Sequence, residues 1–248
     1  MAATPQEIKK YMKKGAETVE EGLPGWFGTF ADMMTLLFAF FVLLAAISTI
    51  DPVKLQNMAD SMGKSVGKKE ELDNQAMSLG DIHKAATKMV EEMAADPQTG
   101  EKPVEVTTSP KGVTIGISSD ISFESGSANT KPGFLEILKK IVPTIQESYN
   151  MLAIEGHTDS DQLPKALLAR YPSNWELSGA RASAVVRLLI GLDVDPVRLQ
   201  SVGYGEFVPR DKNTAEIITA DLIQKYNSNP QQKSRNRRVE ITFLAPNL

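Results

Sequence analysis

Residues 26–50 read WFGTFADMMTLLFAFFVLLAAISTI, and this apolar stretch decides the architecture of the chain. An α-helix of about 20 apolar residues is long enough to cross the hydrocarbon core of a bilayer. The stretch is also longer than the roughly 7–15 apolar residues of a signal-peptide core. We therefore predict a retained transmembrane helix, preceded by a tail at residues 1–25.

Asp32 is the only ionisable side chain within this span. On an insertion scale a central Asp costs about 3 kcal/mol, whereas the Leu, Ile, Phe and Val residues of the span together favour insertion by about 5 kcal/mol. An intramembrane carboxylate is by default a proton or cation site, so we predict that Asp32 binds an ion. The alternative is an interfacial carboxylate that caps the helix, since Asp32 lies only about 9 Å past Trp26.

Composition argues against several other classes of protein. The chain has 248 residues, no Cys, two His and a formal net charge of −4. The lack of Cys excludes disulfides and thiol chemistry, and two His are too few for a His-rich metal site. The net charge gives no reason to expect nucleic acid as a partner. We expect neither an enzyme nor a cofactor, and a single span needs partner helices to enclose an ion path.

The positive-inside rule does not fix the orientation of this span. Within about 20 residues of the span, four lysines precede it and four follow it (Lys9, Lys10, Lys13, Lys14; Lys54, Lys64, Lys68, Lys69). The side of the membrane that receives the C-terminal part must therefore be assigned on other grounds.

Residues 51–66 have the pattern of a short amphipathic helix. Asp51-Pro52 is a typical helix start, and Leu55, Met58 and Met62 recur on one side of the helix. One interpretation is a juxtamembrane helix on the lipid surface. The other is a segment that packs against the membrane assembly and blocks it. Residues 67–102 are rich in charged and amide side chains and are predicted to form a helical or flexible linker.

Residues 103–248 are predicted to form one α/β domain. Alternating patterns predict strands at 104–108, 112–117, 151–155, 199–202 and 239–243. Helical patterns follow Pro132-Gly133 and cover residues 174–190. Because strands alternate with helices, we predict an open sheet with helices packed on one face.

Polar residues gather in three stretches of this domain: EGHTD at 155–159, NWELSGARA at 174–182 and NRRVE at 236–240. Asp159 after a strand and Arg181 near a helix start suit a zwitterion, because a carboxylate takes an ammonium group and a guanidinium takes a carboxylate. The alternative is that Asp159 and Arg181 pair with each other structurally. A metal or hydrolytic site at His157 and Asp159 lacks a second His, a Cys or a suitable Ser motif.

The arginines near the C-terminus (Arg235, Arg237, Arg238) could form a phosphate patch. We favour the interpretation that they flank and line the last strand.

In this order, the three motifs resemble the OmpA-like peptidoglycan-binding domain, over about residues 110–244. With FADMM at 30–34 near the start of a single span, the whole chain resembles the MotB/PomB family of stator subunits of the bacterial flagellar motor. The family order of tail (1–25), span (26–50), plug (51–66), linker (67–102) and wall-binding domain (103–248) is matched. Residues 161–171 and 211–233 are longer than in outer-membrane relatives, which leaves the shape of these loops open.

The resemblance implies a mechanism and a location. Two copies of the chain would lie inside a ring of five MotA/PomA-type subunits in the bacterial inner membrane. The N-terminus would be cytoplasmic, and the C-terminal domain would be periplasmic and dimeric. Asp32 would bind the transported ion, and Leu55, Met58 and Met62 would plug the channel.

The resemblance also assigns the wall contacts. Asp159 and Arg181 match the family positions that hold the ammonium and carboxylate of diaminopimelate in the wall peptide. Thr158, Asn174 and Arg238 belong to the same motifs and are expected to contact peptidoglycan.

The resemblance favours sodium as the ion, because Phe30 precedes the Ala-Asp pair where proton-type spans often carry Tyr. Sodium needs several oxygen ligands, and Asp32, backbone carbonyls, Thr29 or Thr35 and the partner could supply them. A proton needs only the carboxylate. Two other hypotheses remain open: a structural wall anchor without transport, against which Asp32 argues, and an ion-driven motor with a non-flagellar task.

Overall fold

The structure is a computed structural model that describes residues 4–17, 24–47, 77–93, 102–213 and 216–245. The chain divides into two compact units, Met1–Thr49 and Ile50–Leu248, and each is described by itself. The predicted helix at 51–66, with Leu55, Met58 and Met62, lies outside the described residues.

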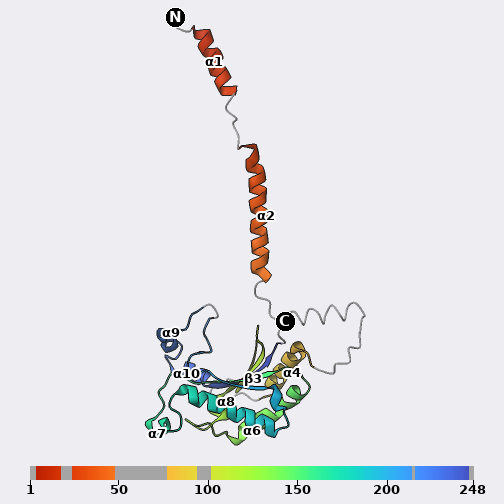
Figure 1. Cartoon of the computed structure of the whole chain (residues 1–248), viewed down its shortest axis with the longest axis vertical. Coiled ribbons are helices and arrows are strands. Elements are labelled where there is room, and N and C mark those ends of the chain that lie inside the picture. Colours follow the sequence, from red (N-terminus) through yellow and green to blue (C-terminus); the bar gives the residue numbers. More distant parts are fainter. Residues whose placement is uncertain (1–3, 18–23, 48–76, 94–101, 214–215, 246–248) are drawn as a thin grey trace, which may run out of the picture. The chain divides into compact units, whose positions relative to one another are not determined.

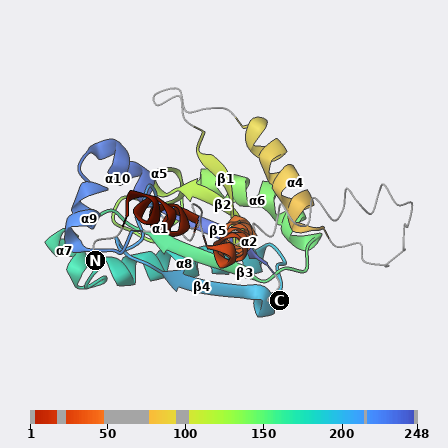
Figure 2. The same cartoon turned by 90° about the horizontal axis from the view of Figure 1, so that it is seen from above.

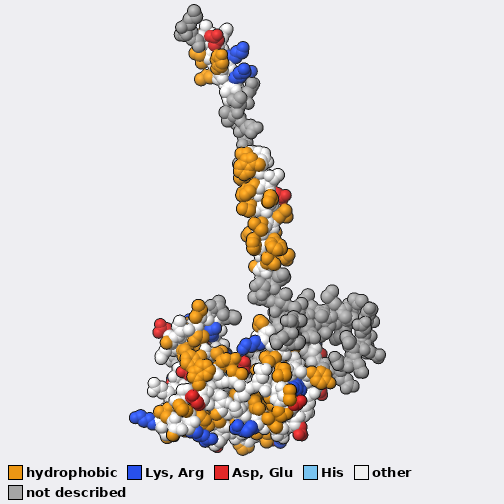
Figure 3. Space-filling view, in the orientation of Figure 1, with side chains coloured by type: hydrophobic (Ala, Val, Ile, Leu, Met, Phe, Trp, Pro, Cys, Tyr) orange, Lys and Arg blue, Asp and Glu red, His pale blue; other side chains and the backbone are white. Residues whose placement is uncertain are grey.

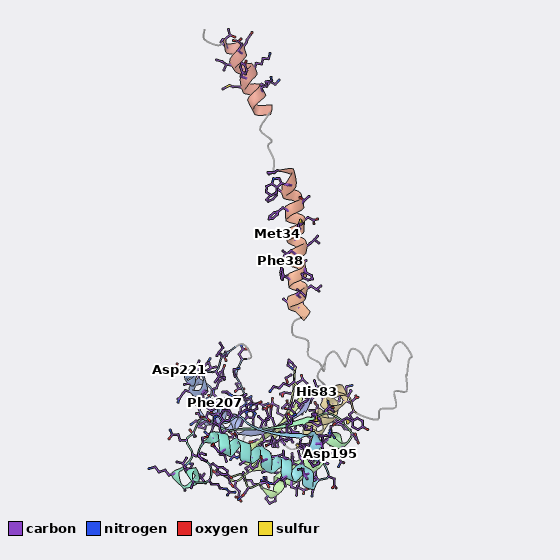
Figure 4. All side chains as sticks on the ribbon, viewed as in Figure 1. Met34, Phe38, His83, Asp195, Phe207 and Asp221 are labelled. Carbon is purple, nitrogen blue, oxygen red and sulfur yellow. The ribbon has the colours of Figure 1, made fainter. Side chains whose placement is uncertain are left out.

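The first unit contains the helices α1 (Pro5–Glu17) and α2 (Gly25–Ile47). Among the described residues, only α2 is long and apolar enough to cross a membrane, over Gly25–Ala46. Hydrophobic side chains cover α2 in Figure 3, and Met34 and Phe38 project outward from it in Figure 4. In the isolated chain Met34 is 48 % exposed and Phe38 is 70 % exposed, so α2 has the surface of a helix that is solvated by lipid or by partner helices.

The second unit is built on a five-stranded sheet in the order β1-β2-β5-β3-β4. The strands are β1 (Val104–Ser109), β2 (Gly112–Ser118), β3 (Leu152–His157), β4 (Leu199–Gly203) and β5 (Arg238–Leu244). Neighbouring strands are antiparallel except β3 and β4, which are parallel. In Figure 2, β1 and β4 lie at opposite edges of the sheet.

Helices cover one face of the sheet. The parallel strands β3 and β4 are joined through α8 (Asn174–Gly191), which packs on both of them. In Figure 1, α6 (Pro132–Gln146) lies on the same side of the sheet as α8, and α4 (Leu79–Glu91) contacts α6, β1 and β2. Short helices occupy the loops: α5 (Ser119–Ser122), α7 (Lys165–Leu168), the 3₁₀ helix η1 (Pro196–Arg198), α9 (Ala220–Lys225) and α10 (Pro230–Asn236). The predicted sheet with helices on one face is confirmed.

The core lies between the sheet and these helices. Alternate strand residues point to one face of a sheet, and here the alternating Val and Ile residues of β2, β3 and β5 face the helices. They meet apolar residues at helical spacing on α6 and α8. The fully buried members include Val113, Ile115, Ile117, Ile154, Val239, Ile241, Phe134, Leu138, Ile141, Ile145, Val185 and Leu189. Burying each such side chain contributes about 1.5–3 kcal/mol.

The helix α4 lies within the stretch that was predicted as a linker. Its residues Leu79, Ile82 and Ala86 are buried in the core, at the i, i+3 and i+7 spacing of one helix face. Ser78 caps the helix by accepting a hydrogen bond from the backbone N–H of Asp81 at 3.2 Å. Since charged residues dominate the rest of the stretch, its composition hid this short stripe. The folded unit therefore includes residues before position 103.

Candidate functional site

Asp32 lies on α2 between two threonines, Thr29 and Thr35, at positions i−3 and i+3. Residues three apart are neighbours on a helix surface, so the three side chains form a line of oxygen groups on an otherwise apolar helix. The Thr29 hydroxyl donates to the carbonyl of Trp26 at 2.7 Å, and the Thr35 hydroxyl donates to the carbonyl of Asp32 at 2.8 Å. A hydroxyl that donates its hydrogen still offers lone pairs, so the hydroxyl oxygens of both threonines can coordinate a cation.

Aromatic side chains surround the start of α2. Trp26 contacts Phe27 and Phe30 edge to face, with ring centroids 6.1 and 6.2 Å apart. Trp is enriched at the membrane–water interface, which suits an interfacial position for this end of the helix. The capping and ion-binding interpretations of Asp32 both agree with this position, so the ion site stays a prediction.

In the second unit, the loop after β3 is tied to the start of α8. Asn174 donates from its side-chain amide to the carbonyls of Asp159 at 3.3 Å and Asp161 at 3.1 Å. Ser173 caps α8 through a reciprocal pair of bonds with Glu176, the capping box. The contacts of Asn174 fix the backbone that carries Asp159 against the first turn of the helix that carries Arg181.

Asp159 is 8 % exposed and pairs with Arg237, whose Nη1 donates to Asp159 Oδ2 at 2.7 Å. The same guanidinium donates to Asp120, from Nε to Oδ1 at 3.1 Å and from Nη2 to Oδ2 at 3.0 Å. The hydrogen bonds to Asp120 and Asp159 hold the pKa of Arg237 above its usual value. Burial alone would raise the pKa of Asp120, but hydrogen bonds from Arg237 and Ser234 lower it.

Arg181 is 5 % exposed and does not pair with Asp159 in the described part of the chain. Its Nε donates to the carbonyl of Ser127 at 2.9 Å, and its guanidinium lies over the Phe123 ring at 5.2 Å. Burial lowers the pKa of Arg181, while the charge of nearby Asp159 opposes that shift. Its Nη1 and Nη2 make no hydrogen bond to any described residue, so this end of the guanidinium is open to a ligand carboxylate.

The remaining predicted wall contacts divide into two groups. Thr158 lies beside Asp159 and is 4 % exposed, and its hydroxyl has no hydrogen-bond partner among the described residues. Arg238 is instead held by Glu240, with Nε 2.6 Å from Oε1, and by the carbonyls of Asn236 and Val208. Thr158 and Asn174 thus lie with Asp159, whereas the hydrogen bonds of Arg238 are made to residues outside this loop.

Arg237 and Asp120 are site residues that the sequence did not single out. Arg237 lies at the end of α10 and Arg238 is the first residue of β5, so the turn between them and the register of the last strand decide which arginine of NRRVE reaches Asp159. That register, with His157 opposite Arg238, is known only from the structure. Asp120 lies in α5, far from the three motifs in sequence.

Glu155, His157 and Glu240 form a cluster whose potential metal-ligand atoms lie within 4.8 Å of one another. Its carboxylates already have cationic partners: Lys111 Nζ lies 3.4 Å from Glu155, and Arg238 Nε lies 2.6 Å from Glu240. Burial and the charge of Arg238 lower the pKa of His157 to about 4. The cations would repel a metal ion, so we interpret the cluster as a network of paired charges on the sheet face opposite the helices.

This geometry, a sheet with helices on one face and a cluster of polar residues where β3 ends and α8 begins, is that of an OmpA-like domain. The OmpA family model matches residues 122–220. A putative MotB-like protein from Desulfovibrio vulgaris shares the fold, with a TM-score of 0.51 and 24 % identity over 68 % of this chain and 96 % of that one.

A second family model, described as membrane MotB of the proton-channel complex MotA/MotB, matches residues 9–66. Motility protein B of Bacillus subtilis is 29 % identical over 95 % of both chains. The uncharacterized protein YtxE of the same organism is 28 % identical over 93 % of both chains. The chain therefore combines a MotB-like N-terminal segment, which contains the candidate membrane helix, with an OmpA-like C-terminal domain.

Proposed function

We propose that this chain is a stator subunit that couples ion flow through a membrane complex to torque and anchors that complex to peptidoglycan. The observation that carries the proposal is Asp32, a single carboxylate on the apolar helix α2. A helix that served only as an anchor would gain nothing from a buried carboxylate, which costs about 3 kcal/mol at the centre of a bilayer. Similarity to MotB proteins supports the same function.

In the membrane, two copies of the chain would lie within a ring of five MotA/PomA-type subunits, and Asp32 of each copy would bind and release the ion. One charge that crosses 100 mV releases about 2.3 kcal/mol, so repeated transfers can drive rotation of the partner ring. We propose sodium as the ion, with Thr29 and Thr35 adding oxygens to the Asp32 carboxylate. The description of the matching family names a proton channel, so ion identity needs a test of its own.

At the wall, the chain would hold a zwitterionic group of the stem peptide in the periplasm. Asp159 would take the ammonium group, and the open end of the Arg181 guanidinium would take the carboxylate. Charge-assisted hydrogen bonds of this kind are about twice as strong as neutral ones. Because Arg237 already donates to Asp159 Oδ2, the ammonium would either approach Oδ1 or displace one Arg237 nitrogen.

The substitution Asp32→Asn tests the proposal, because it keeps the size of the side chain and removes its charge. Expressed with its partner, the variant should assemble in the membrane but conduct no ions and produce no torque. Asp32→Glu is the matched control and should retain part of both activities. Normal ion flux and motility in Asp32→Asn would leave only a wall anchor.

A further inference from the structure

Trp175 and Phe207 form a stacked aromatic pair on the surface of the domain. Their ring centroids lie 5.2 Å apart with an interplanar angle of 23°. Trp175 is the second residue of α8 and is 48 % exposed. In Figure 4, Phe207 lies at the end of the domain that also carries Asp221 of α9. A stacked aromatic pair that stays partly exposed offers a ring face to a ligand.

The pair is connected through the backbone to the proposed peptide site at Asp159 and Arg181. Gly205, at a φ of +54°, turns the chain after β4, and its N–H donates to the Ser178 hydroxyl at 3.0 Å. The carbonyl of Gly205 accepts the N–H of Thr158 at 2.9 Å. Phe207 follows this turn directly, and Trp175 follows Asn174, whose amide holds the carbonyl of Asp159. The same backbone segments therefore carry the aromatic pair and the proposed peptide site.

Unpartnered polar atoms lie in the same backbone segments. Glu206 Oε2, beside Phe207, is shielded from solvent and has no hydrogen-bond partner among the described residues. The Thr158 hydroxyl, 4 % exposed in total, is in the same state. A shielded polar atom without a partner is unfavourable by about 1–3 kcal/mol. A ligand that brings hydroxyl or amide groups would remove that penalty where a side-chain rotation turns these atoms towards it.

Aromatic rings combined with polar acceptors match the chemistry of a sugar. The face of an aromatic ring carries partial negative charge, which attracts the C–H groups on one face of a pyranose, while the hydroxyl and acetamido groups of the sugar reach polar atoms at the edge. Ligand sites commonly combine such apolar surfaces with a few placed polar groups. A membrane or a second protein would not need acceptors of this kind beside the rings.

We propose that Trp175 and Phe207 form a stacking platform for a sugar ring of the wall glycan, next to the proposed site for the stem peptide. The inference rests on the proposed wall binding at Asp159 and Arg181. Stem peptides branch from the glycan, so a peptide bound at Asp159 and Arg181 brings a sugar ring near the platform. The platform then selects peptides that are still attached to glycan over free peptides.

The test compares two probes prepared from the same cell wall: the free stem peptide and the same peptide linked to its disaccharide. Their affinities for the detergent-solubilised full chain are measured by calorimetry. The disaccharide should tighten binding about three- to tenfold, the range of one aromatic stacking contact. Trp175→Ala should remove this gain and leave the affinity for the free peptide unchanged. Trp175→Phe should keep most of the gain.

Tyr149→Ala is the matched control, because Tyr149 is an aromatic residue that is 74 % exposed and lies outside the three motifs. It should leave both affinities unchanged. The platform is overturned if the disaccharide adds nothing to the wild-type affinity, or if its gain survives in a folded Trp175→Ala variant. Equal loss for both probes would make Trp175 structural, and altered self-association in Trp175→Ala would make the surface an interface between copies. If neither probe binds the wild type, the proposed wall binding fails as well.

Discussion

Arg237 bridges Asp159 and Asp120: its Nη1 lies 2.7 Å from Asp159 Oδ2, while its Nε and Nη2 hold Asp120 at 3.1 and 3.0 Å. The carboxylate proposed for the ammonium of the wall peptide therefore already has a cationic neighbour. If the hydrogen bond from Arg237 to Asp159 is broken, Arg237 still keeps its two hydrogen bonds to Asp120. Ligand binding at Asp159 can thus proceed by exchange of one hydrogen bond, without release of the Arg237 side chain.

The first prediction concerns the proposed peptide site at Asp159 and Arg181. Asp159→Ala and Arg181→Ala each remove one charged partner of the ligand, and a hydrogen bond to a charged group contributes about 1.5–3 kcal/mol. Each substitution should weaken peptidoglycan binding by about 10- to 150-fold. The measurement is co-sedimentation of a fragment that begins at residue 77 with purified peptidoglycan, together with its thermal melting curve.

Arg187→Ala is the control for this prediction, because Arg187 is an exposed arginine on the same helix α8. It should leave binding unchanged. If Asp159→Ala and Arg181→Ala keep normal binding and normal melting, both residues are merely structural.

The second prediction concerns Arg237 itself. Arg237→Gln leaves Asp120 and Asp159 without their shared cation and should lower the free energy of unfolding at pH 7 by about 1–3 kcal/mol. The folded state lowers the pKa of Asp120, so this stability is present above the ordinary Asp pKa of about 3.9 and is lost as the pH falls below it. Denaturant unfolding should therefore show a difference between wild type and variant that shrinks towards pH 3.

Arg235→Gln provides the comparison, since Arg235 is 44 % exposed and its ion pair with Asp211 lies at the surface. Surface pairs contribute about 0–1 kcal/mol, so this variant should unfold nearly as the wild type does. A pH-independent loss in Arg237→Gln would assign its effect to packing rather than to charge.

The third prediction concerns α4. Ile82 is fully buried, and Ile82→Ala should destabilise the domain by about 2–5 kcal/mol. Lys84→Ala is the control on the same helix, because its side chain is 66 % exposed, and it should change stability by less than about 0.5 kcal/mol. Chemical denaturation of the fragment from residue 77 measures both values. A fragment that begins at residue 103 lacks α4 and should be less stable than the longer one; equal stability would contradict the packing of α4.

The fold was predictable where periodicity is strong, as in the alternating strand β2 and the amphipathic helix α8, which starts at Asn174 as expected. Asp159 and Asn174 were both predicted as wall contacts, and the amide of Asn174 does hold the Asp159 backbone. The role of Arg237 was not predictable, because Arg237 lies between α10 and β5 and only the tertiary structure brings its side chain to Asp159 and Asp120. The packing of α4 into the core was not predicted from the helical or flexible linker expected at residues 67–102, because its apolar stripe is short and its exposed faces are charged.

The fourth prediction concerns residues 51–66, which lie outside the described residues. If Leu55, Met58 and Met62 close the channel before the wall is engaged, deletion of residues 53–66 should let ions leak when the chain is expressed with its partner. Growth should slow, and cytoplasmic pH or sodium should shift. A deletion within residues 67–76 is the control and should not leak. Absence of a leak in both strains would favour the lipid-surface helix.

The last prediction is the identity of the ion. If Asp32 carries sodium, swimming speed at fixed pH should fall as sodium is replaced by potassium and should survive a protonophore. Thr29 and Thr35 lie beside Asp32 and offer hydroxyl lone pairs, so Thr35→Val should raise the sodium concentration needed for half-maximal speed. Thr35→Ser keeps the hydroxyl and should behave as the wild type. A proton needs only the carboxylate. If the ion is a proton, the swimming speed of the cells should be independent of sodium, should fall to zero with the protonophore and should be unchanged by Thr35→Val.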